Sequence, residues 1–133
     1  MKKKVSLFML CGVILLGLCG CGNESIEDKI AGKNFTYKEE SEQSAYGTII
    51  TVEEFSFIGN GKGYEKVNIE FTGSFKDYAD KNNLSEPTTY DITYTIDDDI
   101  INITTELDEH KLKYDKDSKC LIDTEKETRK FCQ

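Results

Sequence analysis

The sequence predicts an all-β domain of about eight short antiparallel strands, arranged as a small barrel or, alternatively, as a β-sandwich. Three observations support this prediction. From residue 34 onward, apolar and polar residues alternate in short segments, which is typical of strands with one buried face. Glycine, asparagine and aspartate residues separate these segments as turns. Residues 26–133 are enough for one domain with its own core.

The alternating segments locate the individual elements. Strands are expected at residues 34–39, 48–58, 65–75, 88–96, 101–105, 110–114, 119–123 and 129–132. The clearest of them carries apolar or aromatic residues at alternate positions from Tyr90 to Ile96. A short N-terminal helix is expected at residues 24–31, where Gly32 ends it.

Two places interrupt the alternation. The apolar phase of the second strand slips directly after Val52, at Glu53-Glu54, which predicts a β-bulge there. Residues 76–87 form a longer polar connection, in which one helical turn is expected around Tyr78.

The first 20 residues form a separate segment. Three lysines come first, and an uncharged apolar run of about 14 residues then extends from Val5 to Leu18, too short for a bilayer that needs roughly 20. This order is typical of a signal peptide. The run ends in Leu18-Cys19-Gly20-Cys21, which resembles the lipobox of bacterial lipoproteins. Residues 1–20 are therefore expected to be a lipoprotein signal peptide.

The lipobox resemblance implies that Cys21 carries a diacylglycerol on its sulfur. Cys19 is not expected to be the acceptor, because Leu18 before it is not small. Two acyl chains give stable retention, since each buried CH₂ contributes about 0.8 kcal/mol. Residues 21–25 are thus expected to be a lipidated tether and residues 26–133 a β domain, held on the extracytoplasmic face of the cell membrane.

The expected processed chain is strongly acidic. It holds all 25 acidic residues but only 14 of the 17 basic ones, because three lysines lie in the signal peptide, and its net charge is therefore near −11. Such a charge repels nucleic acid, whose affinity comes mainly from Lys and Arg on phosphates. No nucleic-acid partner is expected, and the acidity is interpreted as a means of solubility.

The five cysteines reduce to one pair. Cys11 and Cys19 leave with the signal peptide and Cys21 is lipidated, so Cys120 and Cys132 remain. An even pair of cysteines in an exported protein favours a disulfide.

The register of the last hairpin agrees with this disulfide. With Cys120 opposite Cys132, Leu121 faces Phe131 and Asp123 faces Arg129. The first of these is an apolar pair and the second an ion pair, both of which stabilise antiparallel strands.

The chain also resembles the small lipocalin-like domains of bacterial lipoproteins. The matching segments are the Ile30–Phe35 opening, the aromatic strand and glycine turn at Phe55–Gly63, and the closing strands at Tyr94–Ile103, Lys111–Asp115 and Cys120–Ile122. The resemblance implies a calycin-type β-barrel with a short N-terminal helix. It implies no particular ligand, because such folds carry many functions.

No catalytic residue, metal site or cofactor is expected. His110 is the only histidine and shares its strand phase with Leu112, so a partly buried position is favoured over catalysis. The Asp97–Asp99 turn offers three carboxylates and no glycine, whereas calcium takes six to eight oxygens. The Asp115–Lys119 turn carries a lysine at a ligand position. Both turns are interpreted as solvated, and the protein is not expected to be an enzyme.

An aromatic stripe is the set most suggestive of binding. Its members are Phe57, Phe71, Tyr90, Tyr94 and Tyr114. Such residues line ligand cavities or fill the interior of small barrels, and the filled core is favoured. Two functions follow as hypotheses. One is a lipid-anchored protein that binds a small apolar ligand or lipid; the other is a protein-interaction module of the immunity or adhesion type with a filled core.

Overall fold

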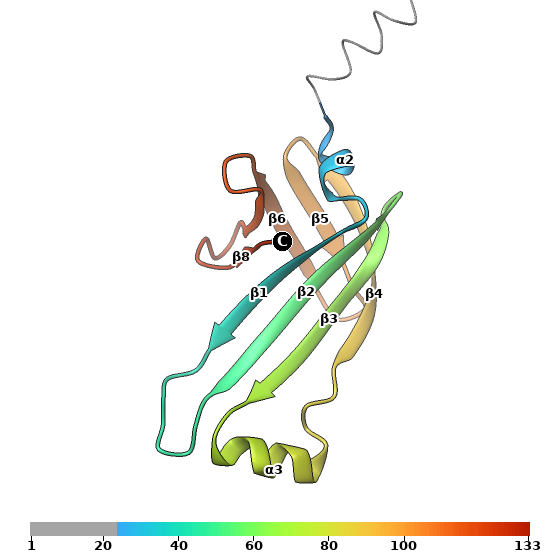
Figure 1. Ribbon diagram of the computed structural model, residues 1–133. Coiled ribbons are helices and arrows are strands. Elements are labelled where there is room, and N and C mark those ends of the chain that lie inside the picture. Colours follow the sequence, from blue (N-terminus) through green and yellow to red (C-terminus); the bar gives the residue numbers. More distant parts are fainter. Residues whose placement is uncertain (1–23) are drawn as a thin grey trace, which may run out of the picture.

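The computed structural model describes residues 24–133, so the expected signal peptide and Cys21 lie outside the described residues. Two helices and eight strands make up the described chain (Figure 1). In order they are α2 (Ile26–Ile30), β1 (Lys33–Glu40), β2 (Ile49–Gly59), β3 (Lys62–Phe71), α3 (Ser74–Asn82), β4 (Thr88–Asp97), β5 (Ile100–Thr104), β6 (Glu109–Asp115), β7 (Cys120–Asp123) and β8 (Lys130–Phe131). None of the helices within residues 24–133 is long and apolar enough to cross a membrane.

The eight strands form one antiparallel meander in which each strand pairs with the next along the chain. The sheet curls until its last residues meet its first strand, because Thr36 and Cys132 exchange two backbone hydrogen bonds of 2.8 and 3.0 Å. The fold is therefore a nearly closed barrel, and the alternative of a β-sandwich is wrong.

One end of the barrel, called the filled end here, is packed solid beneath α2. Ile30 enters it from the helix, and the rings of Phe57 and Tyr94 meet edge to face at 5.1 Å. The Glu27 carboxylate accepts hydrogen bonds from the Tyr94 hydroxyl and the backbone N–H of Asn60, both 2.9 Å long. Burial, and after it the bond to Glu27, raise the pKa of Tyr94 to about 12. The short helix is thus fixed as a cap on this end.

The second strand corrects one expectation. Its register with β3 is continuous from Ile49 to Phe57, and the irregularity lies between Phe57 and Gly59, beside the turn. No bulge occurs at Glu53-Glu54. The apolar phase slips there because Glu53 faces the barrel interior in the same phase as Phe57, so the pattern records an inward carboxylate.

The connection between β3 and β4 also differs from expectation. β3 ends at Phe71, whereas the alternation predicted a strand to residue 75, and Phe75 belongs to α3. The helix covers Ser74–Asn82, more than the single turn expected around Tyr78, and it lies beyond the ends of β1–β3, far from α2 (Figure 1).

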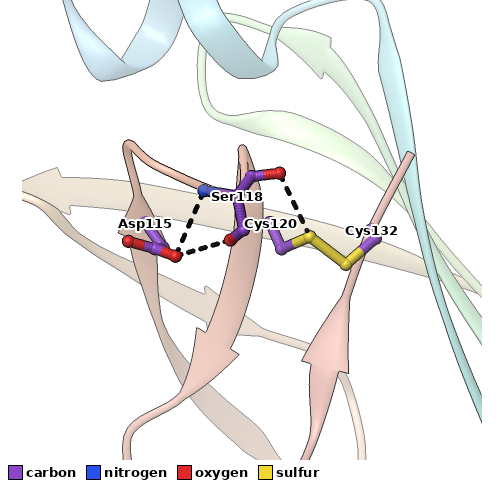
Figure 2. The surroundings of a disulfide bond; sticks show 4 residues. All are labelled: Asp115, Ser118, Cys120 and Cys132. Carbon is purple, nitrogen blue, oxygen red and sulfur yellow. Dashed lines mark hydrogen bonds between the residues drawn. A yellow bond between two sulfur atoms is a disulfide. The ribbon is translucent and has the colours of Figure 1, made fainter.

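The predicted terminal hairpin is confirmed. Cys120 and Cys132 form a disulfide with their Cα atoms 4.4 Å apart (Figure 2). Leu121 pairs with Phe131 in the same hairpin. The turn before β7 is closed by Asp115, whose carboxylate accepts a 2.5 Å hydrogen bond from the Ser118 hydroxyl. This bond lowers the pKa of Asp115.

Candidate functional site

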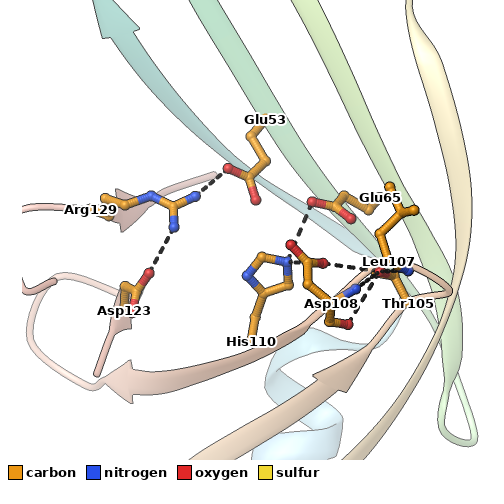
Figure 3. Close-up of polar contacts among 8 residues, drawn as sticks. All are labelled: Glu53, Glu65, Thr105, Leu107, Asp108, His110, Asp123 and Arg129. Carbon is orange, nitrogen blue, oxygen red and sulfur yellow. Dashed lines mark hydrogen bonds and ion pairs between the residues drawn. The ribbon is translucent and has the colours of Figure 1, made fainter. Parts of the chain in front are cut away.

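Charged side chains cross the barrel interior above the aromatic core. They are Glu53 on β2, Glu65 on β3, His110 on β6, Asp123 on β7 and Arg129 just before β8, and are called the charged layer here (Figure 3). The strand registers place them inward, because directly opposed residues share a face of the sheet. The partners across the sheet are Phe55 for Glu65, Ile103 for His110 and Leu112 for Asp123, all of them buried in the core.

Arg129 joins the two sides of this layer. Its guanidinium donates a 2.8 Å hydrogen bond to Asp123 and a second, short one to Glu53 (Figure 3). The ring centroids of Tyr37 and Phe131 each lie 5.3 Å from the guanidinium carbon. Burial by itself would lower the pKa of Arg129, but the charges of Glu53 and Asp123 raise it above its ordinary value. Arg129 is therefore held as a cation.

His110 faces the same interior with one nitrogen free of hydrogen bonds. Its Nε2 is buried and has no hydrogen-bond partner among the described residues. The Glu65 carboxylate lies 3.7 Å from Nε2. An Asp108 oxygen lies 3.1 Å from the same nitrogen, but the two atoms do not form a hydrogen bond. The imidazole packs against the ring of Phe55 with centroids 5.4 Å apart. The sequence correctly indicated a partly buried position for this residue.

Asp108 is fixed at the edge of the charged layer by the turn that carries it. The Thr105 hydroxyl donates to the Asp108 carboxylate at 3.0 Å and accepts from the Asp108 and Leu107 amides at 3.1 Å (Figure 3). The carboxylate therefore stays beside His110.

The charged layer has an excess of negative charge. Glu53, Glu65 and Asp123 are all buried, and among residues 24–133 Arg129 is the one lysine or arginine that pairs with any of them, through Glu53 and Asp123. Burial, and after it the neighbouring Glu53 carboxylate, raise the pKa of Glu65 to about 8. Without a further cation, Glu65 consequently holds a proton at neutral pH.

The barrel interior becomes progressively more exposed beyond the charged layer. Along β2 the inward side chains change from fully buried at Phe55 to 36% exposed at Ile49, and on β3 Ile69 is 38% exposed. We call this region, lined by Ile49, Ile69, Phe71 and Tyr90, the open end. β1–β3 extend past the shorter strands there (Figure 1). The charged layer thus separates the filled end from a solvent-accessible, apolar inner face.

The structure divides the predicted aromatic stripe between the two ends. Phe57, Tyr94 and Tyr114 belong to one buried cluster at the filled end. Phe71 and Tyr90 are half-buried and face the open end, because they pair with Ile49 and Glu65. The five residues therefore do not line a single cavity.

One carboxylate in each of the two acidic turns has a partner within the protein. Asp99 pairs with Lys113 at 3.7 Å, and the Asp115 carboxylate is occupied by Ser118. Asp97, Asp98, Lys116 and Asp117 of these turns are exposed to solvent.

In comparisons with family models, curated proteins and solved structures, nothing matches this chain. The function is therefore argued from the residues of the barrel themselves.

We predict that Glu65→Gln makes the stability of the barrel less dependent on pH. The pKa of Glu65 rises from an ordinary 4.5 to about 8 on folding, so between these values the folded state holds a proton that the unfolded chain has released. Stability therefore falls as pH rises across this window. Urea unfolding between about pH 5 and about pH 9 should show the wild type losing on the order of 2 kcal/mol more than the variant.

Glu54→Gln on the outer face of β2 is the control for this experiment and should keep the wild-type slope. Equal slopes for wild type and Glu65→Gln would contradict the assignment of a raised pKa to Glu65.

Proposed function

We propose that this protein is a lipid-anchored extracytoplasmic lipoprotein with a lipocalin-like barrel, and that it binds a small apolar ligand at its open end. One observation carries the proposal. The barrel is packed solid at one end, whereas at the other its inward apolar side chains are left partly exposed, with Ile49 and Ile69 the most accessible. Apolar surface inside a barrel mouth is the usual wall of a ligand site.

The membrane anchor is supported by two separate features. Leu18-Cys19-Gly20-Cys21 has the residue types of a lipobox, and the Cys120–Cys132 disulfide fits an oxidising, exported location. Cys21 precedes Ser25, the N-cap of α2, by four residues, which span at most about 14 Å. The filled end would then face the membrane and the open end would face away from it, so the ligand would enter from the aqueous side.

Binding is favoured over catalysis by the state of the reactive groups. One oxygen of Glu53 is paired with Arg129, and the Thr105 hydroxyl is bonded to Asp108. The Thr105 oxygen also accepts hydrogen bonds from the Leu107 and Asp108 backbone amides, so its lone pairs are not available for the attack on a substrate that covalent catalysis requires.

A second function, protein interaction, is favoured by exposed aromatic side chains near α3. Tyr46 and Tyr78 are about two-thirds exposed, at 65% and 64%, and Tyr46 packs on Phe75 with ring centroids 6.2 Å apart. Aromatic residues are enriched at the centres of protein interfaces. This surface lies outside the barrel, so the two functions are separable by mutation.

Cys21→Ser is predicted to release the protein from the membrane. Without the thiol no diacylglycerol is attached, and the apolar anchoring energy is lost. Membrane and soluble fractions of the producing cells, compared by immunoblot and by palmitate labelling, measure the effect. Cys19→Ser should remain membrane-bound and labelled. Labelling that follows Cys19 instead of Cys21 would overturn the assignment.

Ile69→Glu is predicted to weaken binding of a fluorescent fatty-acid analogue by at least tenfold, which is about 1.4 kcal/mol. The substitution adds a charge to the apolar face of the open end without disturbing the filled core. Ile58→Glu is the matched control, because Ile58 is 59% exposed and lies at the end of β2 away from the open end. A wild-type protein that does not bind the probe, or equal affinity in both variants, would argue for the protein-interaction function.

A further inference from the structure

We propose that Glu53, Glu65 and His110 form a binding site for a divalent transition-metal ion such as Zn²⁺. The three side chains come from β2, β3 and β6, and one ligand atom of each lies within 4.8 Å of the others. This site lies in the charged layer, below the apolar surface at the open end. The inference goes beyond the proposed function and does not depend on it.

The spacing of the donor atoms fits a shared ion better than a direct contact. His110 Nε2 and Glu65 Oε1 are 3.7 Å apart, which is too long for a hydrogen bond. Two ligands bound tetrahedrally to one zinc at 2.0–2.2 Å are separated by about 3.4 Å. Small side-chain rotations therefore suffice to bring both atoms onto one ion.

The hydrogen-bond inventory is an independent indication of a missing ligand. Nε2 of His110 is buried without a partner, although buried polar atoms are nearly always satisfied. The Glu65 side chain is only 8% exposed, and no N–H group of residues 24–133 donates a hydrogen bond to it. The unpartnered His110 nitrogen and the buried Glu65 carboxyl group thus face the same small volume.

The charge balance fits a divalent cation. When the ion displaces the proton of Glu65, the buried carboxylates of Glu53, Glu65 and Asp123 carry three negative charges against the single guanidinium of Arg129, which leaves an excess of two when His110 is neutral. A divalent ion neutralises this excess. Asp108, at the edge and more exposed, lies 3.1 Å from His110 Nε2 and is available as an additional ligand.

The donor set selects the kind of metal. Imidazole and carboxylate together suit zinc and neighbouring transition metals, whereas calcium takes six to eight oxygens. The surroundings hold the ligands in place, since Arg129 fixes one oxygen of Glu53 and the ring of Phe55 packs against His110.

The test is a Zn²⁺ titration followed by calorimetry. The full chain is purified in detergent without metal, and its free thiols are alkylated first so that cysteines outside the barrel do not bind the probe. We expect one Zn²⁺ per chain, and at least tenfold weaker binding in Glu65→Gln and in His110→Gln. Co²⁺ added to the same samples should give an absorption spectrum that both substitutions remove.

Two neighbours of the ligands provide matched controls. Glu54→Gln and Glu109→Gln remove outward-facing carboxylates adjacent to Glu53 and His110, and both should bind Zn²⁺ as the wild type does. Circular dichroism establishes that each variant is folded; Glu65→Gln replaces a carboxyl group that is protonated at neutral pH by a neutral amide of the same size and should fold well. Absence of Zn²⁺ binding, or equal affinity in Glu65→Gln and the two controls, would overturn the proposal. A loss of metal binding leaves the fatty-acid titration unaffected, so the two proposals fail separately.

Discussion

Few backbone hydrogen bonds close the barrel, and the ion pairs of Arg129 stabilise the closure in addition to them. β8 contains two residues, and a single bridge between Thr36 and Cys132 joins the last segment to β1. Arg129 reaches from this segment across the interior to Glu53 on β2, while the disulfide ties Cys132 to β7 on the outside. We call the junction between β1 and the last segment, residues 129–132, the seam. The disulfide and the ion pairs of Arg129 stabilise this seam, where only one backbone bridge forms.

This closure determines how the interior is divided. A charged residue at the seam needs buried partners, because an unpaired buried charge is costly, and Glu53 and Asp123 supply them. Polar groups therefore occupy a level of the barrel that aromatic side chains would otherwise fill. Packing at the filled end provides most of the apolar burial, whereas the charged layer and the open end are left for binding. Within residues 24–133, no lysine or arginine pairs with the more acidic half of this layer, around Glu65 and His110.

Much of the fold was predictable from the sequence, because strand alternation and turn residues are local signals. The all-β class and the ion pair between Asp123 and Arg129 were predicted from local pattern, and the Cys120–Cys132 disulfide from the count of remaining cysteines together with the hairpin register. The charged layer was not, since Glu53 and Glu65 come together from different strands and their inward direction contradicts the rule that charges face water. The slip in apolar phase at Glu53 was the available signal, and it was misinterpreted as a bulge. The end of β3 was also predicted wrongly. Phe75 continues the apolar alternation of the strand, although it lies in α3.

A double-mutant cycle between Arg129 and Glu53 tests most directly whether this ion pair closes the barrel. Urea unfolding of the metal-free, disulfide-intact protein would be compared for Arg129→Met, Glu53→Gln and the double variant. If the pair closes the seam, Arg129→Met alone costs about 3 kcal/mol or more, because it leaves buried carboxylates uncompensated, and adding Glu53→Gln restores a large part of that loss. Strictly additive effects of the two substitutions would contradict this account of the fold.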